Sequence, residues 1–219
     1  MRSKPKSHRG SRGFTLAEIM VALTVMGLVI AGVMTFFLQA LKVYYYDSGR
    51  LMVNRDMRTF TNALANDAVA SNYFRIYPTF QNRTAPVTDG TSGDFLVLAF
   101  TDTNNTAGAY YITQLTGYYR SPNDSTNPSS LGPVRRFSKT IATADQSKDL
   151  PTLVGLYIPA TATPTDPVVI QLAQGLSNGT LFYDYRDRSI MVRGQIVDYG
   201  SQGGRAAINT YNFTVSPRG

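Results

Sequence analysis

Residues 13–38 read GFTLAEIMVALTVMGLVIAGVMTFFL, and this stretch decides much of the fold. Ile19 through Leu38 form an uninterrupted apolar run of 20 residues without a charged side chain. As one helix, a run of that length spans the roughly 30 Å hydrocarbon core of a lipid bilayer. Glu18, the only glutamate of the chain, stands directly before this run. An ionised side chain in such a segment costs about 2.5–3.5 kcal/mol on insertion scales, so Glu18 is a candidate functional residue that needs a charged partner.

The residues before the apolar run occur in a specific order. Gly13 and Phe14 precede Glu18, and residues 1–13 carry five basic side chains and no acidic one. Together, Gly13, Phe14, Glu18 and the apolar helix resemble the N-terminal processing signal of the type IV pilin superfamily, which includes pilins and the pseudopilins of type II secretion systems. The resemblance implies a pilin-like fold, no cofactor, and a leader peptide of residues 1–13 that is cleaved after Gly13. It also implies that Phe14, the new N-terminal residue, is N-methylated.

The resemblance assigns an assembly role to Phe14 and Glu18. Cleavage leaves an amine on Phe14 that is largely protonated at neutral pH. In the family, the glutamate at this position pairs with the terminal amine of a neighbouring subunit, which neutralises two charges at low dielectric. The implied partners are other pilin or pseudopilin subunits, the prepilin peptidase, the inner-membrane assembly platform and the lipid bilayer.

The basic leader predicts the orientation of the chain in the membrane. Basic residues next to a span stay cytoplasmic, so we expect a single-pass protein of the bacterial inner membrane with its head in the periplasm, later part of a pilus or pseudopilus. One alternative is an ordinary single-span membrane protein in which Glu18 has no partner. Another is a secretory signal, but its apolar core is usually about 7–15 residues long and ends in a small-residue cleavage site. The nearest candidate here, Leu38-Gln39-Ala40, matches such a site poorly.

Composition argues against an enzyme and against a nucleic-acid-binding protein. Without residues 1–13, the remaining 206 residues carry 16 basic and 14 acidic side chains, so the high net charge comes mainly from the leader. The chain has no cysteine, and its single histidine, His8, lies in the leader. A cysteine–histidine catalytic pair, a histidine-based metal site and a stabilising disulfide are therefore excluded from residues 14–219.

The apolar helix is expected to continue beyond the membrane. No proline occurs from Phe14 to Tyr77, so we expect a transmembrane or filament-core helix over 14–46 and an amphipathic continuation over 47–77. In the continuation, apolar residues recur at steps of three and four, which predicts one buried helix face: Val53, Met57, Phe60, Leu64 and Ala68. Within the span, Gly27, Ala31 and Gly32 are small residues that allow close helix packing in lipid.

Residues 78–219 are expected to form a β-rich globular head. Short apolar or alternating runs separated by turn residues predict strands, which fall at 95–100, 109–119, 134–141, 153–158, 168–172, 180–185, 189–197 and 211–215. The class is therefore α+β, with an antiparallel sheet packed on the second half of the long helix.

Weaker features concern the subgroup and ligands of the head. The stretch 51–57 and the layout of the later strands resemble J-type minor pseudopilins and related minor pilins, which implies a minor subunit. Asp102 and Asn104 lie two positions apart in a loop whose side chains carry oxygen atoms, which makes them weak candidates for calcium ligands. This loop lacks the glycine and glutamate of a helix–loop–helix calcium site, so no metal site is predicted. A second functional hypothesis is a binding module for DNA, a secretion substrate or a surface, with contacts from the loops 101–108 and 121–133.

Overall fold

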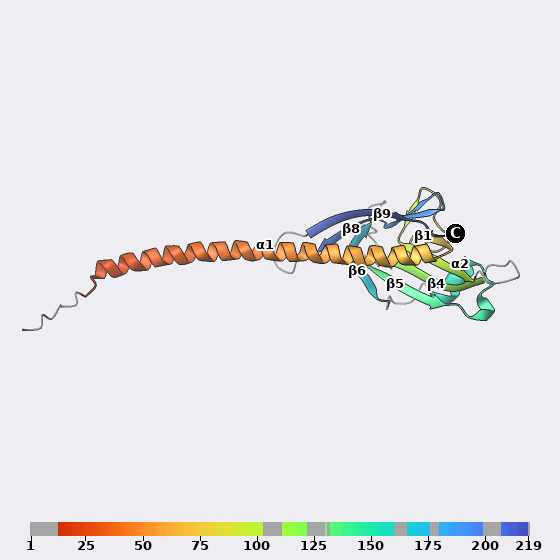
Figure 1. The fold of residues 1–219 in the computed structure, drawn as a ribbon, viewed down its shortest axis with the longest axis horizontal. Coiled ribbons are helices and arrows are strands. Elements are labelled where there is room, and N and C mark those ends of the chain that lie inside the picture. The colour runs from red at the N-terminus through yellow and green to blue at the C-terminus, as the bar shows by residue number, and fades with distance from the viewer. Residues whose placement is uncertain are drawn as a thin grey trace, which may run out of the picture. The chain divides into compact units, whose positions relative to one another are not determined.

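The computed structural model describes residues 13–102, 111–121, 130, 132–159, 166–175, 180–198 and 207–218. A long N-terminal helix is followed by antiparallel strands and a short second helix (Figure 1), which confirms the predicted α+β class and is consistent with a pilin-like fold. The chain divides into two compact units, Met1–Tyr45 and Tyr46–Gly219.

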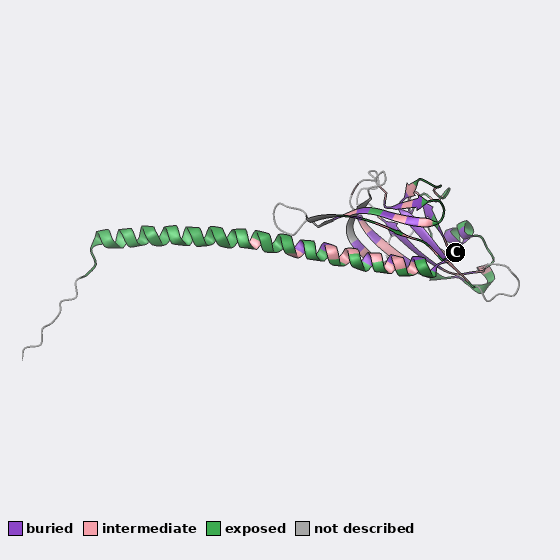
Figure 2. Cartoon of the chain, turned by 45° about the horizontal axis from the view of Figure 1, so that its top comes forward, coloured by how far each residue is buried: buried purple, intermediate pink, exposed green. Residues whose placement is uncertain are grey.

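The first unit contains the N-terminal part of helix α1 (Leu16–Ala70). Its described side chains are almost all exposed, including the large apolar ones (Figure 2); Phe14 is 84% exposed and Leu28 is 74% exposed. A continuous apolar surface of this kind is uncommon on soluble monomers and marks a membrane or protein contact. Among the described residues, α1 is the one helix long and apolar enough to cross a membrane.

In the second unit, the continuation of α1 buries one face against the sheet. Val53, Phe60, Leu64 and Ala68 are buried and Met57 is partly buried, so the predicted amphipathic face is confirmed. The spacing of three and four residues keeps these side chains on one side of the helix. Arg55, Arg58 and Asn62 are exposed on the remaining surface of the helix, and Leu51 and Met52 are exposed as well.

The predicted helix end at Tyr77 is wrong, because α1 ends at Ala70. Ser71 closes the helix with hydrogen bonds from its N–H and its hydroxyl back to carbonyls of the last turn. Strand β1 (Tyr73–Tyr77) follows and pairs antiparallel with Phe95–Ala99. Aromatic and branched side chains fit a pleated, half-buried surface, so these residues join the sheet although no proline interrupts the helix pattern.

The remaining elements follow in chain order. They are β2 (Ser92–Gly93), β3 (Phe95–Asp102), β4 (Tyr111–Arg120), β5 (Gly132–Thr140), the 3-10 turn η1 (Thr143–Asp145), α2 (Leu150–Tyr157), β6 (Val168–Gly175), β7 (Phe182–Tyr185), β8 (Ser189–Asp198) and β9 (Ala207–Val215).

The strands form one antiparallel sheet with the order β1-β3-β4-β5-β6-β8-β7-β2, and β9 pairs with β8 outside this path. Along one edge of β8, β7 pairs with residues 189–192 and β6 with residues 194–196, while β9 pairs along the other edge from 190 to 198. The described residues therefore place β9 at an edge of the sheet.

Most strand predictions are confirmed, including the hairpin of β7 and β8. Its turn residues Arg186 and Asp187 have φ values of 57° and 51°, and two such residues in succession are typical of a type I′ turn. The Arg188 N–H donates to the Tyr185 carbonyl at 3.2 Å, and the pairing of Tyr185 with Ser189 leaves three residues in the loop. In β9, Tyr211 is buried and Phe213 and Val215 are half-buried, whereas Asn212 and Thr214 between them are exposed, as the alternation predicts.

The predicted strand over 153–158 is wrong, because these residues belong mainly to helix α2. Leu150, Leu153 and Val154 are buried at helical spacing, and Pro151 lies in the first turn, where its missing N–H has no helical partner to lose. A short apolar run of this length fits a buried strand and a helix equally well, so tertiary packing decides.

The sheet is covered on both faces, which explains the continuous apolar sequence of β3. Leu96 and Leu98 pack in the cluster that contains the α1 face, whereas Phe95, Val97 and Ala99 pack in a second cluster with α2. Because successive strand side chains point to opposite faces, both sets are buried.

Two polar links hold the elements of the head together. Arg120, whose side chain is fully buried, donates from Nε and Nη2 to Asp94 Oδ2 at 2.9 and 2.6 Å, and the Leu181 N–H donates to Asp94 Oδ1 at 2.9 Å. In the second link, Arg136 of β5 forms an ion pair with Asp67 of α1 at 2.8 Å. The first link joins the β2–β3 corner, β4 and the start of β7, and the second joins helix to sheet.

Candidate processing and assembly site

The expected cleavage point lies just outside helix α1. Residues 13–15 have no regular secondary structure and α1 begins at Leu16, so the Gly13–Phe14 peptide bond is not protected by helical hydrogen bonds. Gly13 is exposed, and a side chain placed on it would meet no atom within 4 Å. The bond is therefore open to a protease that approaches the backbone closely.

Glu18 and Thr15 together cap the start of α1. The Thr15 N–H donates to Glu18 Oε2 at 2.8 Å and the Thr15 hydroxyl donates to the same oxygen at 3.0 Å. In return, the Glu18 N–H donates to Thr15 Oγ1 at 3.3 Å. This reciprocal arrangement is a capping box, which satisfies N–H groups that have no partner inside the helix.

The capping box adds Thr15 to the site, and the sequence reasoning missed it. The pattern of threonine, two residues and an acid directly before an apolar run was present at 15–18 and would have identified it. Glu18 thus has a structural role within its own chain. Its carboxylate also lies at the positive end of the helix dipole, which favours the ionised form.

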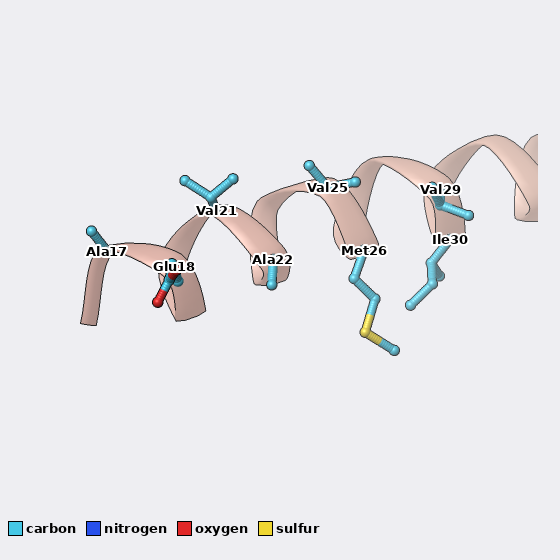
Figure 3. A pocket seen from close by; sticks show the side chains of 8 residues that line it. All are labelled: Ala17, Glu18, Val21, Ala22, Val25, Met26, Val29 and Ile30. Atoms are coloured by element: carbon cyan, nitrogen blue, oxygen red, sulfur yellow. The ribbon is translucent and has the colours of Figure 1, made fainter. Parts of the chain in front are cut away.

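Glu18 is exposed, and no ion pair to it occurs within the described residues. It stands at one end of a shallow apolar groove along α1 (Figure 3), lined by Ala17, Glu18, Val21, Ala22, Val25, Met26, Val29 and Ile30. Every other lining side chain is apolar, so a second helix on this face would place Glu18 in a low-dielectric contact.

The small residues predicted for helix packing lie farther along α1. Gly27 and Gly32 would each meet nothing within 4 Å if they carried a side chain, so packing within the chain does not explain the glycines. Ala31 is exposed, and its carbonyl accepts a hydrogen bond from the Thr35 hydroxyl at 2.8 Å, so this polar group is satisfied inside the apolar helix.

The described part of the head contains no group of three or more histidine, cysteine, aspartate or glutamate side chains that could hold a metal. Asp102, the first weak candidate, lies exposed at the end of β3, and Asn104 lies outside the described residues. The binding-module hypothesis rested on the loops 101–108 and 121–133, most of which also lie outside the described residues.

Comparison with known proteins identifies the N-terminal segment. Residues 8–34 match the family model described as the prokaryotic N-terminal methylation motif. The matched segment contains Gly13, Phe14, Thr15 and Glu18. No curated protein and no solved structure shows significant similarity to the chain.

The motif belongs to structural subunits rather than enzymes, and it implies processing by prepilin peptidase and assembly with other pilin subunits. Combined with the exposed apolar part of α1, it indicates a membrane-anchored precursor. The chain carries a type IV pilin-like prepilin signal at its N-terminus.

Proposed function

We propose that this chain is a subunit, in a minor role, of a type IV pilus or a type II secretion pseudopilus. Prepilin peptidase removes residues 1–13, Phe14 becomes the N-methylated terminus, and the chain assembles through α1 from the inner membrane. The head faces the periplasm before assembly. The observation that carries this proposal is the exposed apolar surface of α1 with one acid, Glu18, at its start, inside the matched methylation motif.

In the assembled state, Glu18 pairs with the N-terminal amine of a neighbouring subunit. The N-terminal end of a helix carries partial positive charge, so the new amine of Phe14 is poorly placed near its own helix. An acid on a second helix offers a better site. The apolar groove beside Glu18 fits this contact, because a helix docked there removes water and strengthens the attraction between the two charges.

The capping box explains how the acid is tolerated before assembly. The two hydrogen bonds from Thr15 satisfy Glu18 Oε2 within its own chain. Assembly then adds the charge partner that the lone carboxylate lacks. Gly27, Ala31 and Gly32 permit close approach of neighbouring helices in the same filament core.

Cleavage is tested by mass spectrometry of the protein extracted from membranes of cells with active prepilin peptidase. We expect a chain that starts at Phe14 and carries one methyl group on its terminal nitrogen. Gly13→Val should accumulate as the uncleaved precursor, because a branched side chain blocks close approach to the bond. Gly10→Val is the matched control and should be processed normally. An intact Met1 terminus in the wild-type protein would contradict the proposal.

The role of Glu18 is tested separately with Glu18→Val. This variant should be cleaved and inserted into the membrane as the wild type is, but it should fail to enter filaments. Sheared or purified filaments are probed for the variant beside total membrane protein. Normal incorporation would remove the assembly role assigned to Glu18 and leave the processing signal intact.

A further inference from the structure

Strand β9 has one free edge in the described structure. The Arg193 N–H donates to the Leu181 carbonyl on the β7 side of β8, at 3.0 Å. Because backbone groups alternate along a strand, the even-numbered residues of β8 face β9, where Val192 pairs with Phe213 and Gly194 with Tyr211.

The register then assigns the backbone groups of β9. Tyr211 and Phe213 direct their N–H and C=O groups toward β8. Thr210, Asn212 and Thr214 direct theirs to the opposite edge, and all three residues are exposed. No described backbone group forms a hydrogen bond with that edge.

Within the part of the chain that the structure describes, this edge lacks the usual protection against strand pairing. Natural edge strands are shortened, bulged, covered, or carry charges or proline. Residues 207–215 read AINTYNFTV, with no charge, no proline and several residues of high β propensity. The register of β9 with β8 continues without a shift over its whole length. Such an edge is a template for another strand.

The edge of β1 shows the contrast. It is short and carries the exposed Arg75. On its outward side, the Ile76 carbonyl accepts a hydrogen bond from the Val87 N–H at 2.8 Å. Within the described residues, the β1 edge is thus partly protected, whereas the outward edge of β9 has no backbone partner.

We propose that β9 accepts an extended segment of a neighbouring polypeptide in the filament, added as an antiparallel strand along Thr210, Asn212 and Thr214. The segment carries no charged side chain beside these residues, because the edge offers no opposite charge. The identity of this neighbour as a filament component rests on the proposed function.

The direction of β9 excludes an antiparallel pair of two β9 strands. Tyr211 and Phe213 pack on Phe60 of α1, with ring centroids 6.1 and 6.2 Å from its ring, and the Arg218 N–H donates to the carbonyl of Ser71 beyond the helix end. Hence β9 and this part of α1 run in the same direction. Antiparallel pairing of two β9 strands would reverse one head relative to the other, whereas in the proposed filament every α1 enters from the same membrane and the heads share one orientation.

Hydrogen exchange on the wild-type protein, processed at Gly13 in both states, tests the proposal. The backbone amides of Thr210, Asn212 and Thr214 should exchange quickly in the detergent-solubilised monomer and at least about tenfold more slowly in assembled filaments. The amides of Tyr211 and Phe213 should be protected in both states because they face β8. Unchanged exchange at the outward amides on assembly would overturn the proposal.

Proline variants test the same edge by assembly. Asn212→Pro and Thr214→Pro remove outward N–H groups without removing a hydrogen bond to β8, so near-UV circular dichroism should stay native. Their incorporation into filaments should fall about tenfold, while Asn212→Ala and Thr214→Ala incorporate normally. Equal incorporation of folded proline and alanine variants would refute strand addition. Loss of assembly in Glu18→Val alongside normal proline variants would leave the proposed function standing and this inference overturned.

A single cysteine identifies self-pairing. The chain contains no cysteine, so Asn212→Cys introduces a unique thiol. Under mild oxidation of filaments, we expect no disulfide-linked homodimer through residue 212. A homodimer in high yield would show that the edge pairs with its own copy and would overturn the assigned occupant.

Discussion

The buried pair of Asp94 and Arg120 is expected to be the most sensitive polar contact of the head. The side chains are 2% and 0% exposed, and Asp94 accepts hydrogen bonds from Arg120 and from the Leu181 N–H. Burial raises the pKa of Asp94, and its hydrogen bonds and charge attraction with Arg120 oppose that rise. The perturbation is Asp94→Ala, which leaves the guanidinium in the interior without its carboxylate and the Leu181 N–H without its acceptor.

The loss in the free energy of unfolding caused by Asp94→Ala can be estimated from these contacts. Removing one member of a buried ion pair costs about 3–5 kcal/mol, because an uncompensated charge stays buried. A lost acceptor for a buried N–H adds about 1–3 kcal/mol unless water enters the space. Since a domain is stable by only about 5–15 kcal/mol, Asp94→Ala should lose at least a large fraction of its stability. The carbonyl of Ser130, which accepts from Arg120 Nη1 at 2.6 Å, is neutral and does not replace the lost charge.

Urea unfolding of the full chain in detergent, followed by tyrosine near-UV circular dichroism, measures the effect. The double variant Asp94→Ala/Arg120→Met should be more stable than Asp94→Ala alone, because it removes the stranded charge as well. Lys148→Ala, which breaks the partly exposed pair of Lys148 and Asp145 but leaves the hydrogen bond from the Tyr157 hydroxyl to Asp145 in place, is the control and should unfold near the wild-type midpoint. A wild-type midpoint for Asp94→Ala, or a double variant less stable than the single one, would show that the unpaired guanidinium is not the source of the instability.

Three further outcomes are expected. Burial and the nearby Asp187 raise the pKa of Asp184 to about 6, so ionisation of this side chain destabilises the fold as the pH rises from about 4 through 6. Asp184→Asn should therefore be more stable than the wild type by about 1 kcal/mol at pH 7.5 and equal to it near pH 4. A stability difference that stays constant across this pH range in unfolding experiments would contradict this cause. Gly117→Ala places a methyl group against the ring of Phe137 and 2.7 Å from a backbone oxygen, so it should cost about 1–3 kcal/mol in the same assay, whereas a neutral effect would mean that the sheet relaxes freely. Thr15→Val removes the hydroxyl of the capping box, whereas Thr15→Ser keeps it. In detergent, the first-turn amides of α1 should therefore exchange hydrogen faster in Thr15→Val than in Thr15→Ser. Equal exchange rates in the two variants would show that the capping box does not stabilise the start of the helix.

The features that the sequence predicted correctly depend on neighbouring residues. The processing signal, the apolar length of α1 and the buried face through Val53, Phe60 and Leu64 are local patterns, because each follows from residues within a few turns of one helix. The alternation in β9 is local for the same reason. Thr15 belongs to this group as well, since its partner Glu18 is only three residues away.

Other features required the tertiary structure, because their physical causes lie far apart in the chain. The helix ends at Ala70 since Tyr73–Tyr77 gain a ladder with β3. The β propensity of these residues becomes decisive only when β3 is there to pair with them. Residues 150–157 are helical because three side chains fill the second core cluster.

From residues close together in the sequence, one can read which helix is apolar enough to cross a membrane and which of its faces is buried, because both depend on the chemistry of adjacent side chains. The tertiary structure was needed to show that Asp94 and Arg120 share one interior site and that the outward edge of β9 has no strand partner among the described residues. Those outcomes depend on which strands become neighbours, and strand order is set by long-range packing that no short stretch of sequence contains.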